Sequence, residues 1–208
     1  MPDQTPAPQV SPNNPCPFLR ALVANGYVGG HIVPLGTLTE DIGLASGKTG
    51  MGLIKAKVLT YGIAMIANGH PLRSMTSGAI LDELRNGPLD KHGAGSRILE
   101  VDGQVDLEQI DRFASFGQEY PNPEGGTERG LNAKQIETFM AENLKRDGDK
   151  ARWTYPIMMK GEWPVLLDIL GKGEGETRYL SVAEVRTLFV ERRFPDRIVA
   201  RLQQAPAA

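Results

Sequence analysis

Cys16 is the single cysteine of the 208-residue chain, and it lies between Pro15 and Pro17. Apolar residues at helical spacing begin at Phe18, so the sequence predicts that Cys16 stands at the N-terminus of a helix. Free backbone N–H groups and the helix dipole favour an anion there, which stabilises a thiolate. A lone thiol forms no internal disulfide, so its chemistry is that of a nucleophile, a redox sensor or a single metal ligand. The alternative is a small buried side chain at a helix start.

Two carboxylates have surroundings that suggest chemistry. Glu162 precedes a run of apolar side chains, and a carboxylate buried among them needs a partner or a function. The alternative for Glu162 is a solvated carboxylate near a helix N-terminus. Glu100 and Asp102 offer oxygen atoms of the kind that hard divalent cations prefer. Their alternative is a solvated turn ahead of a helix that begins near Asp106.

Composition restricts the class of protein. The chain has a net charge of −2, a pI near 6.0 and 40% hydrophobic residues, which fits one globular domain with a sizeable core. The bulk charge gives no reason to expect a nucleic acid or a membrane as partner, so we expect a small molecule. Residues 1–14 hold four prolines and predict a flexible N-terminal arm, and residues 205–208 predict a tail.

Signals for export or membrane insertion are not visible in the sequence. Residues 1–14 have neither the basic region nor the apolar region of a secretory signal, so we expect a cytoplasmic protein. The longest apolar stretch, residues 58–67, is shorter than the about 20 residues that span a bilayer, so no transmembrane helix is expected.

Through most of residues 15–204, apolar side chains recur at helical spacing, as in Ile54, Val58, Tyr61 and Met65. This pattern predicts an all-α fold of about eight helices in a single compact domain, with short strands left open only for residues 97–100. Methionines at such spacing are expected to fill the core; the set is Met51, Met65, Met75, Met140, Met158 and Met159.

Capping residues and glycines predict where helices begin and end. Helix starts are expected at Thr76-Ser77, at Asn132, and at Ser181 with Glu184 three residues later. Glycines that follow apolar runs are expected to end helices in the left-handed conformation: Gly26, Gly69, Gly87, Gly148 and Gly171. The segment Gly47-Lys48-Thr49 lacks the preceding strand and first glycine of a phosphate-binding loop, so no such loop is expected.

Four segments stand in a specific order along the chain. They are residues 15–28 with Pro15-Cys16-Pro17, residues 97–113 with Glu100-Val101-Asp102, residues 160–167 with Gly161-Glu162-Trp163, and residues 185–195 with Glu191-Arg192-Arg193-Phe194-Pro195. In this order they resemble the haem-thiolate peroxidases, the family of chloroperoxidase and the unspecific peroxygenases. The resemblance covers nearly the whole chain, and it rests on the order of the segments more than on any one of them.

The resemblance implies a chloroperoxidase-like helical domain around a buried haem b, with Cys16 as the axial ligand of the iron. It implies that Glu162 is the distal catalytic residue, which moves a proton between the two oxygens of a bound peroxide. Electron density from the thiolate then assists cleavage of the O–O bond. The implied activity is that of an oxidoreductase: a peroxidase or peroxygenase that uses hydrogen peroxide to oxidise, oxygenate or halogenate a small organic substrate.

The resemblance also implies a divalent cation, Mg²⁺ or Mn²⁺, held by Glu100 against a haem propionate. Residues 23–25 lack the histidine that is usual in the first segment of the family. Two further residues depart from the family pattern: Val101 stands where short members have histidine, and Gln104 stands where a serine is usual. These departures leave open a non-catalytic haem-binding or ligand-binding module on the same fold. A haem-free thiol redox protein, in which Cys16 attacks peroxide directly, is also open.

Other candidates for the site are secondary. Tyr155 or Lys160 are candidates to assist Glu162 in place of the histidine that Val101 replaces. The three histidines, at positions 31, 70 and 92, lie in glycine- or proline-rich contexts without metal-ligand spacing. They are expected in loops, with His31 the one expected to lie nearest a site.

Overall fold

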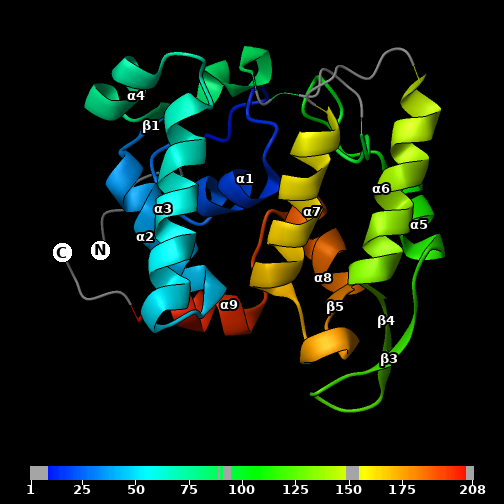
Figure 1. Cartoon of the computed structure of the whole chain (residues 1–208). Coiled ribbons are helices and arrows are strands. Elements are labelled where there is room, and N and C mark those ends of the chain that lie inside the picture. The colour runs from blue at the N-terminus through cyan, green and yellow to red at the C-terminus, as the bar shows by residue number, and fades with distance from the viewer. Residues whose placement is uncertain (1–8, 89, 91–94, 149–154, 205–208) are drawn as a thin grey trace, which may run out of the picture. The chain divides into compact units, whose positions relative to one another are not determined.

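The computed structural model describes residues 9–88, 90, 95–148 and 155–204 (Figure 1). These residues are mostly helical, and they include two small antiparallel sheets. The chain divides into two compact units. Unit 1 comprises residues 1–90, 101–103 and 192–208, and unit 2 comprises residues 91–100 and 104–191.

Unit 1 is built from five α-helices, one 3₁₀-helix and one two-stranded sheet in its described part. The elements are α1 (Pro17–Ala24), β1 (Ile32–Val33), α2 (Leu35–Ser46), α3 (Gly50–Ile66), α4 (Pro71–Ser77), β2 (Ala79–Ile80), η1 (Leu81–Asn86) and α9 (Asp196–Leu202). Helix α3 packs along α2 and runs in front of α1 and α2 in Figure 1. The core contains Phe18 of α1, whose ring lies 4.9 Å from that of Phe194.

The small sheet of unit 1 depends on a glycine. Ile32 pairs with Ile80 and Val33 pairs with Ala79. Gly78 precedes β2 with a φ of +97°, and a Cβ atom there would lie 2.4 Å from the carbonyl oxygen of Val33. Only glycine combines this conformation with so close an approach of two backbones.

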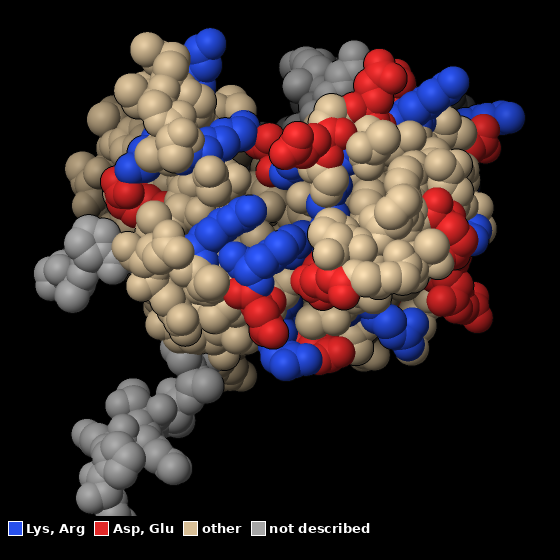
Figure 2. Space-filling model, turned by 90° about the horizontal axis from the view of Figure 1, so that it is seen from below, with Lys and Arg blue, Asp and Glu red and all other residues tan. Residues whose placement is uncertain are grey.

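Unit 2 contains the larger sheet. Its elements are α5 (Leu107–Ser115), β3 (Gln118–Pro121), β4 (Thr127–Asn132), α6 (Ala133–Asp147), α7 (Tyr155–Leu170), η3 (Gly175–Thr177), β5 (Tyr179–Ser181), α8 (Val182–Arg186) and a π-helical turn η4 (Thr187–Glu191). The strand order is β3-β4-β5, and Leu131 of β4 pairs with Leu180 of β5. On the face of the molecule in Figure 2, charges of both signs are interspersed with other residues.

An aromatic cluster forms the core of unit 2. Trp163 of α7 is fully buried, and its ring stacks on Phe113 of α5 at 4.8 Å between centroids. Phe139 of α6 meets both rings edge-on, at 5.3 Å from Trp163 and 5.2 Å from Phe113. These contacts join α5, α6 and α7, because offset-stacked and edge-to-face pairs are the arrangements that aromatic rings prefer.

The prediction of a wholly α-helical chain is correct only in part, because two sheets accompany the helices. Residues 97–100, where a strand was left open, contribute an isolated bridge between Leu99 and Val105. The strands are two to six residues long and carry no alternating apolar pattern long enough to be recognised. Among the described residues, no single helix is long and apolar enough to cross a membrane; α3 and α4 meet that criterion only together, bent by 113°.

Some of the predicted helix starts and ends are confirmed and others are wrong. Asn132 caps α6 with Gln135 in a capping box, and the hydroxyl of Ser181 accepts from the N–H of Glu184, as expected. Gly26, Gly69 and Gly148 have positive φ angles as predicted, whereas Gly87, at φ −73°, and Gly171 do not. The start predicted at Thr76-Ser77 is wrong, because these residues end α4 and Ile80 enters a strand.

A buried lysine joins the strands and helix of unit 2. The side chain of Lys172 is 6% exposed, and its Nζ lies 2.8 Å from Glu128 and 3.3 Å from Glu184. Glu128 also accepts from the hydroxyls of Tyr179, at 2.8 Å, and Ser181, at 2.6 Å. One ammonium group and one carboxylate therefore connect β4, β5 and α8.

The pKa values of this cluster show that its charged forms are favoured. Burial raises the pKa of the Glu128 carboxyl, but hydrogen bonds from Lys172, Ser181 and Tyr179 outweigh burial and bring it below the ordinary 4.5. Burial lowers the pKa of Lys172, but Glu128 and Glu184 outweigh it and bring it above the ordinary 10.5. The stabilisation by Glu128 is therefore present above pH 4.5 and is lost as the pH falls through its lower folded pKa.

The cation that Glu184 contacts, in the first turn of α8, is the ammonium of Lys172. The described part of the chain holds no group of three or more His, Cys, Asp or Glu side chains suited to a metal ion. A side chain supplies the positive charge instead.

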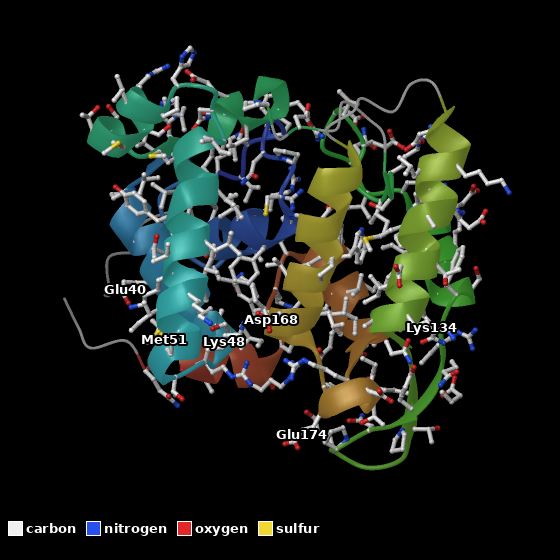
Figure 3. All side chains as sticks on the ribbon, in the orientation of Figure 1. Glu40, Lys48, Met51, Lys134, Asp168 and Glu174 are labelled. Atoms are coloured by element: carbon white, nitrogen blue, oxygen red, sulfur yellow. The ribbon has the colours of Figure 1, made fainter. Side chains whose placement is uncertain are left out.

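We expect the substitution Lys172→Met to lower the free energy of unfolding by about 3 kcal/mol near neutral pH, because it leaves two carboxylates buried without their cation. The loss should shrink at acidic pH, where the carboxylates of the variant are protonated. Urea denaturation of both proteins at neutral and acidic pH measures this. Lys134→Met, at an exposed lysine of α6 (Figure 3), is the control and should change stability by less than about 0.5 kcal/mol. Equal losses in the two variants would contradict the assignment.

Candidate functional site

Cys16 is the N-cap residue of α1, as its sequence context predicts. Its backbone is extended, with φ −91° and ψ 113°, and Pro17 follows at the first helical position. The N–H of Arg20 donates to the Cys16 carbonyl at 3.0 Å, and the Cys16 N–H donates to Oδ1 of Asn14 at 3.1 Å. The side chain is half-buried. The sulfur therefore stands at a fixed helix N-terminus, where a thiolate is favoured.

A buried arginine holds the segment that leads into Cys16. Arg20 is 3% exposed, although it lies on a helix whose other inward residues are mostly apolar. Its guanidinium donates to the carbonyl oxygens of Ser11 at 3.1 Å, Asn14 at 3.3 Å and Gly103 at 3.0 Å. Arg20 thus connects residues 11–14 to a turn that lies far along the chain.

That turn includes Val101 and Asp102, which belong to the segment Glu100-Val101-Asp102. Gly103 has a φ of +82°, and a Cβ atom there would lie 2.9 Å from the Cα of Pro12. The N–H of Arg85 donates to the Asn13 carbonyl at 2.9 Å, from a third part of unit 1. Residues 11–14, which lead into Cys16, are therefore held by Arg20 of α1, by Arg85 of η1 and by the turn at Gly103.

Positive charge gathers around Arg20, one helical turn from Cys16. Burial, together with the charges of Arg192 and Arg85, lowers the pKa of Arg20 to about 10. The guanidinium of Arg85 lies 3.7 Å from the buried carboxylate of Asp90.

Residues 100–104 form a tight turn. The N–H of Glu100 donates to the carbonyl of Gln104 at 2.9 Å. Glu100 is half-buried, Gln104 is exposed, and the side chain of Val101 is directed to solvent, with 52% of its surface exposed. Asp106 follows as the N-cap of α5, accepting from the N–H of Glu108 at 2.9 Å. The expected turn ahead of a helix is therefore present.

Glu162 lies near the middle of α7, which runs from Tyr155 to Leu170. It is half-buried, and its Oε2 atom is shielded from solvent. The next residue, Trp163, is the centre of the aromatic cluster, and Pro164 interrupts the hydrogen bonds of the helix at that level. The solvated position near a helix N-terminus is therefore not what the structure shows.

The sequence-predicted residues are distributed over both units. Cys16 belongs to unit 1, whereas Glu100 and Glu162 belong to unit 2. His31 is exposed and pairs with Asp82 of η1. His92 lies outside the described residues, as do the side chains of Tyr155 and Lys160.

Two hollows lie on unit 1. The larger, of about 520 Å³, is lined by residues 69–73, including His70. The smaller, of about 230 Å³, lies where α2, α3 and α9 meet, and Lys48 and Arg201 are among its lining residues. Neither hollow is lined by Cys16. Helix α2 precedes Gly47, which agrees with the prediction that residues 47–49 are not a phosphate-binding loop.

Comparison with known proteins gives no relative: no protein-family model, no curated protein and no solved structure matches the chain.

The residue that sequence reasoning missed is Arg20. A charged side chain within the apolar run Phe18-Leu19-Arg20-Ala21-Leu22-Val23 was the available signal, because a buried charge requires hydrogen-bonding partners. Its partners are backbone carbonyls, which no sequence pattern identifies.

We expect Arg20→Lys to loosen the segment before Cys16, because an ammonium group cannot reach three separated carbonyls as a guanidinium does. The free energy of unfolding should fall by about 2 kcal/mol. The Cys16 thiol should react several times faster with a disulfide reagent under native conditions. Arg186→Lys, at an exposed arginine of α8, is the control. Unchanged stability and unchanged thiol reactivity would show that Arg20 does not hold this segment.

Proposed function

We propose that the chain is a haem-thiolate peroxidase or peroxygenase that uses hydrogen peroxide to oxidise, oxygenate or halogenate a small organic substrate. In this proposal Cys16 is the axial ligand of haem b and Glu162 is the distal acid–base residue. The observation that carries the proposal is the contact between the segment before Cys16 and the turn at Gly103. Arg20 and Gly103 are 83 residues apart, yet they are joined by a hydrogen bond of 3.0 Å. Two of the motifs that resemble the family are thus neighbours in space.

The residues around Cys16 fit an iron-ligating thiolate. The sulfur is half-buried rather than enclosed in the core, so it is accessible to a ligand. The helix N-terminus favours the deprotonated form of the thiol, which is the form that binds a metal. Pro15 and Pro17 restrict the backbone on both sides, and Arg20 fixes the segment ahead of it. A ligand held in this way keeps one position relative to what it binds.

Haem, when bound, supplies the iron at which the peroxide O–O bond is broken and an oxygen atom is transferred. The chain's own residues divide the remaining tasks. Cys16 donates electron density as a thiolate, and the carboxylate of Glu162 accepts a proton at one peroxide oxygen and returns it at the other. The apolar surroundings of Glu162, with Trp163 beside it, limit the access of water to the carboxylate.

The proposed divalent cation depends on more than Glu100. The side chain of Glu100 is half-buried, and Asp102 and Gln104 are exposed nearby in the turn. Within the described ranges no cluster of three metal-binding side chains is present. A Mg²⁺ or Mn²⁺ ion at Glu100 therefore needs further oxygen ligands, which a haem propionate would provide.

A non-catalytic haem-binding or ligand-binding module is the second candidate. It is favoured by Val101, which replaces the family's histidine and exposes half of its side chain, so this position offers no group to assist Glu162. The half-buried position of Cys16 at a helix N-terminus is equally what a haem-free thiol redox protein needs.

We expect the purified protein to bind haem and, when reduced under carbon monoxide, to show the red-shifted absorption of thiolate ligation. In Cys16→Ala this absorption should disappear, because the chain has no other cysteine. Met51→Ala, which removes an exposed sulfur, is the control and should leave the spectrum unchanged. A spectrum that is unaltered in Cys16→Ala rules out the ligand assignment.

We expect Glu162→Gln to slow peroxide-dependent oxidation of a dye by about 100-fold or more, because the amide cannot carry the proton. The thiolate absorption should be retained. Glu137→Gln, at an exposed position of α6, is the matched control. Stable haem binding with no turnover in the wild type selects the non-catalytic module. Peroxide consumption by haem-free protein, with oxidation of Cys16 to a sulfenic acid, selects the thiol redox protein.

A further inference from the structure

Helix α3 presents an apolar face to solvent. Met51, Ile54 and Val58 form one line along the helix, and Leu59, Ile63 and Ile66 form a neighbouring line, because residues three and four apart share a face. Each of these six side chains is between 40% and 69% exposed. The opposite side of α3 packs on α2. About half of the helix circumference is therefore apolar and open, which is unusual unless the surface binds something.

The apolar surface continues onto α4. Leu72 is 80% exposed and Met75 is 54% exposed. Helices α3 and α4 are in contact and bent by 113° relative to each other, so together they do not form a straight span. Their combined length and hydropathy still meet the requirement for a membrane segment. A helix pair of this composition that cannot cross a bilayer is suited to lie in its surface.

The charged residues on α3 and α4 themselves are all basic: Lys55, Lys57 and Arg73. Residues 42–81 contain four Lys and Arg residues and no Asp or Glu, although the whole chain has a net charge of −2. Lys55 lies between the two apolar lines of α3 and is exposed. Lys57 pairs with Glu40 of α2 at 2.5 Å, and Arg73 pairs with Glu83 of η1 at 3.1 Å. Figure 3 shows Glu40, Lys48 and Met51 around the N-terminal end of α3.

We propose that the apolar face of α3, continued by α4, binds the surface of an anionic lipid bilayer. The six apolar side chains enter the boundary between headgroups and acyl chains, and the stem of Lys55 extends along them so that its ammonium reaches a lipid phosphate or carboxylate. A second copy of the chain fits less well. Two such faces in contact would bury Lys55 without an acidic partner, because residues 42–81 offer none.

This inference does not depend on the proposed haem chemistry. The net charge of the whole chain gave no reason to expect a membrane as partner, because it averages over residues 42–81, which are apolar and basic. The whole chain, with or without haem, is the protein to test.

The test is flotation of the full-length protein with vesicles of phosphatidylcholine, with and without phosphatidylserine. We expect binding to the mixed vesicles, weaker binding to phosphatidylcholine alone, and weaker binding at high salt. Ile54→Gln and Val58→Gln should each lower the partition coefficient by about tenfold, because each removes an apolar side chain from lipid. Lys55→Gln should lower it by about fivefold on the mixed vesicles and leave it unchanged on phosphatidylcholine.

The matched control is Val190→Gln, at an exposed apolar residue of unit 2, which should bind vesicles as the wild type does. Because all four positions are exposed, the variants should keep the circular dichroism spectrum of the wild type. Absence of the protein from the floated vesicles overturns the proposal. So does a dimer, measured by sedimentation velocity, that Val58→Gln dissociates while vesicle binding is unaffected by that substitution.

Discussion

The buried guanidinium of Arg20 is the interaction on which the surroundings of Cys16 depend. A charge is taken out of water only if its hydrogen bonds are replaced, and here three backbone carbonyls replace them. Those carbonyls belong to two segments, residues 11–14 and the turn at Gly103. Because neither segment is regular secondary structure, the hydrogen bonds from Arg20 hold the two segments together. The position of the sulfur follows from this arrangement, since Cys16 comes two residues after Asn14.

Local rules were sufficient where one residue type acts on its nearest neighbours. Asn132 and Ser181 begin helices because their side-chain oxygens accept from backbone N–H groups within the first turn. Gly26 ends α1 because a left-handed residue satisfies the last carbonyls. Cys16 stands at a helix start for the equally local reason that Pro17, with its fixed φ angle and no N–H, suits the first helical position. These features could be read from a few consecutive residues.

The features that were not predicted depend on contacts distant in sequence. Strands β1 and β2 have two residues each, and their pairing depends on Gly78 approaching Val33, 45 positions away in the numbering of the chain. The apolar spacing of α3 correctly predicted a helix, but Met51 and Met75 were expected in the core and are exposed. Periodicity shows which residues share a face and does not show whether that face is covered. Arg20 and Lys172 likewise have partners that are distant in sequence, such as Gly103 and Glu128.

Lys172 gives unit 2 a property that a metal ion at the same place would remove. An ion that stabilises a fold does so in proportion to its free concentration, so the fold then responds to supply, to competing ions and to chelators. The ammonium of Lys172 is part of the chain and is present in every molecule at fixed stoichiometry. The contribution of this cation to the sheet therefore does not vary with the supply of an ion, and it is lost only at a pH where one member of the pair changes its charge.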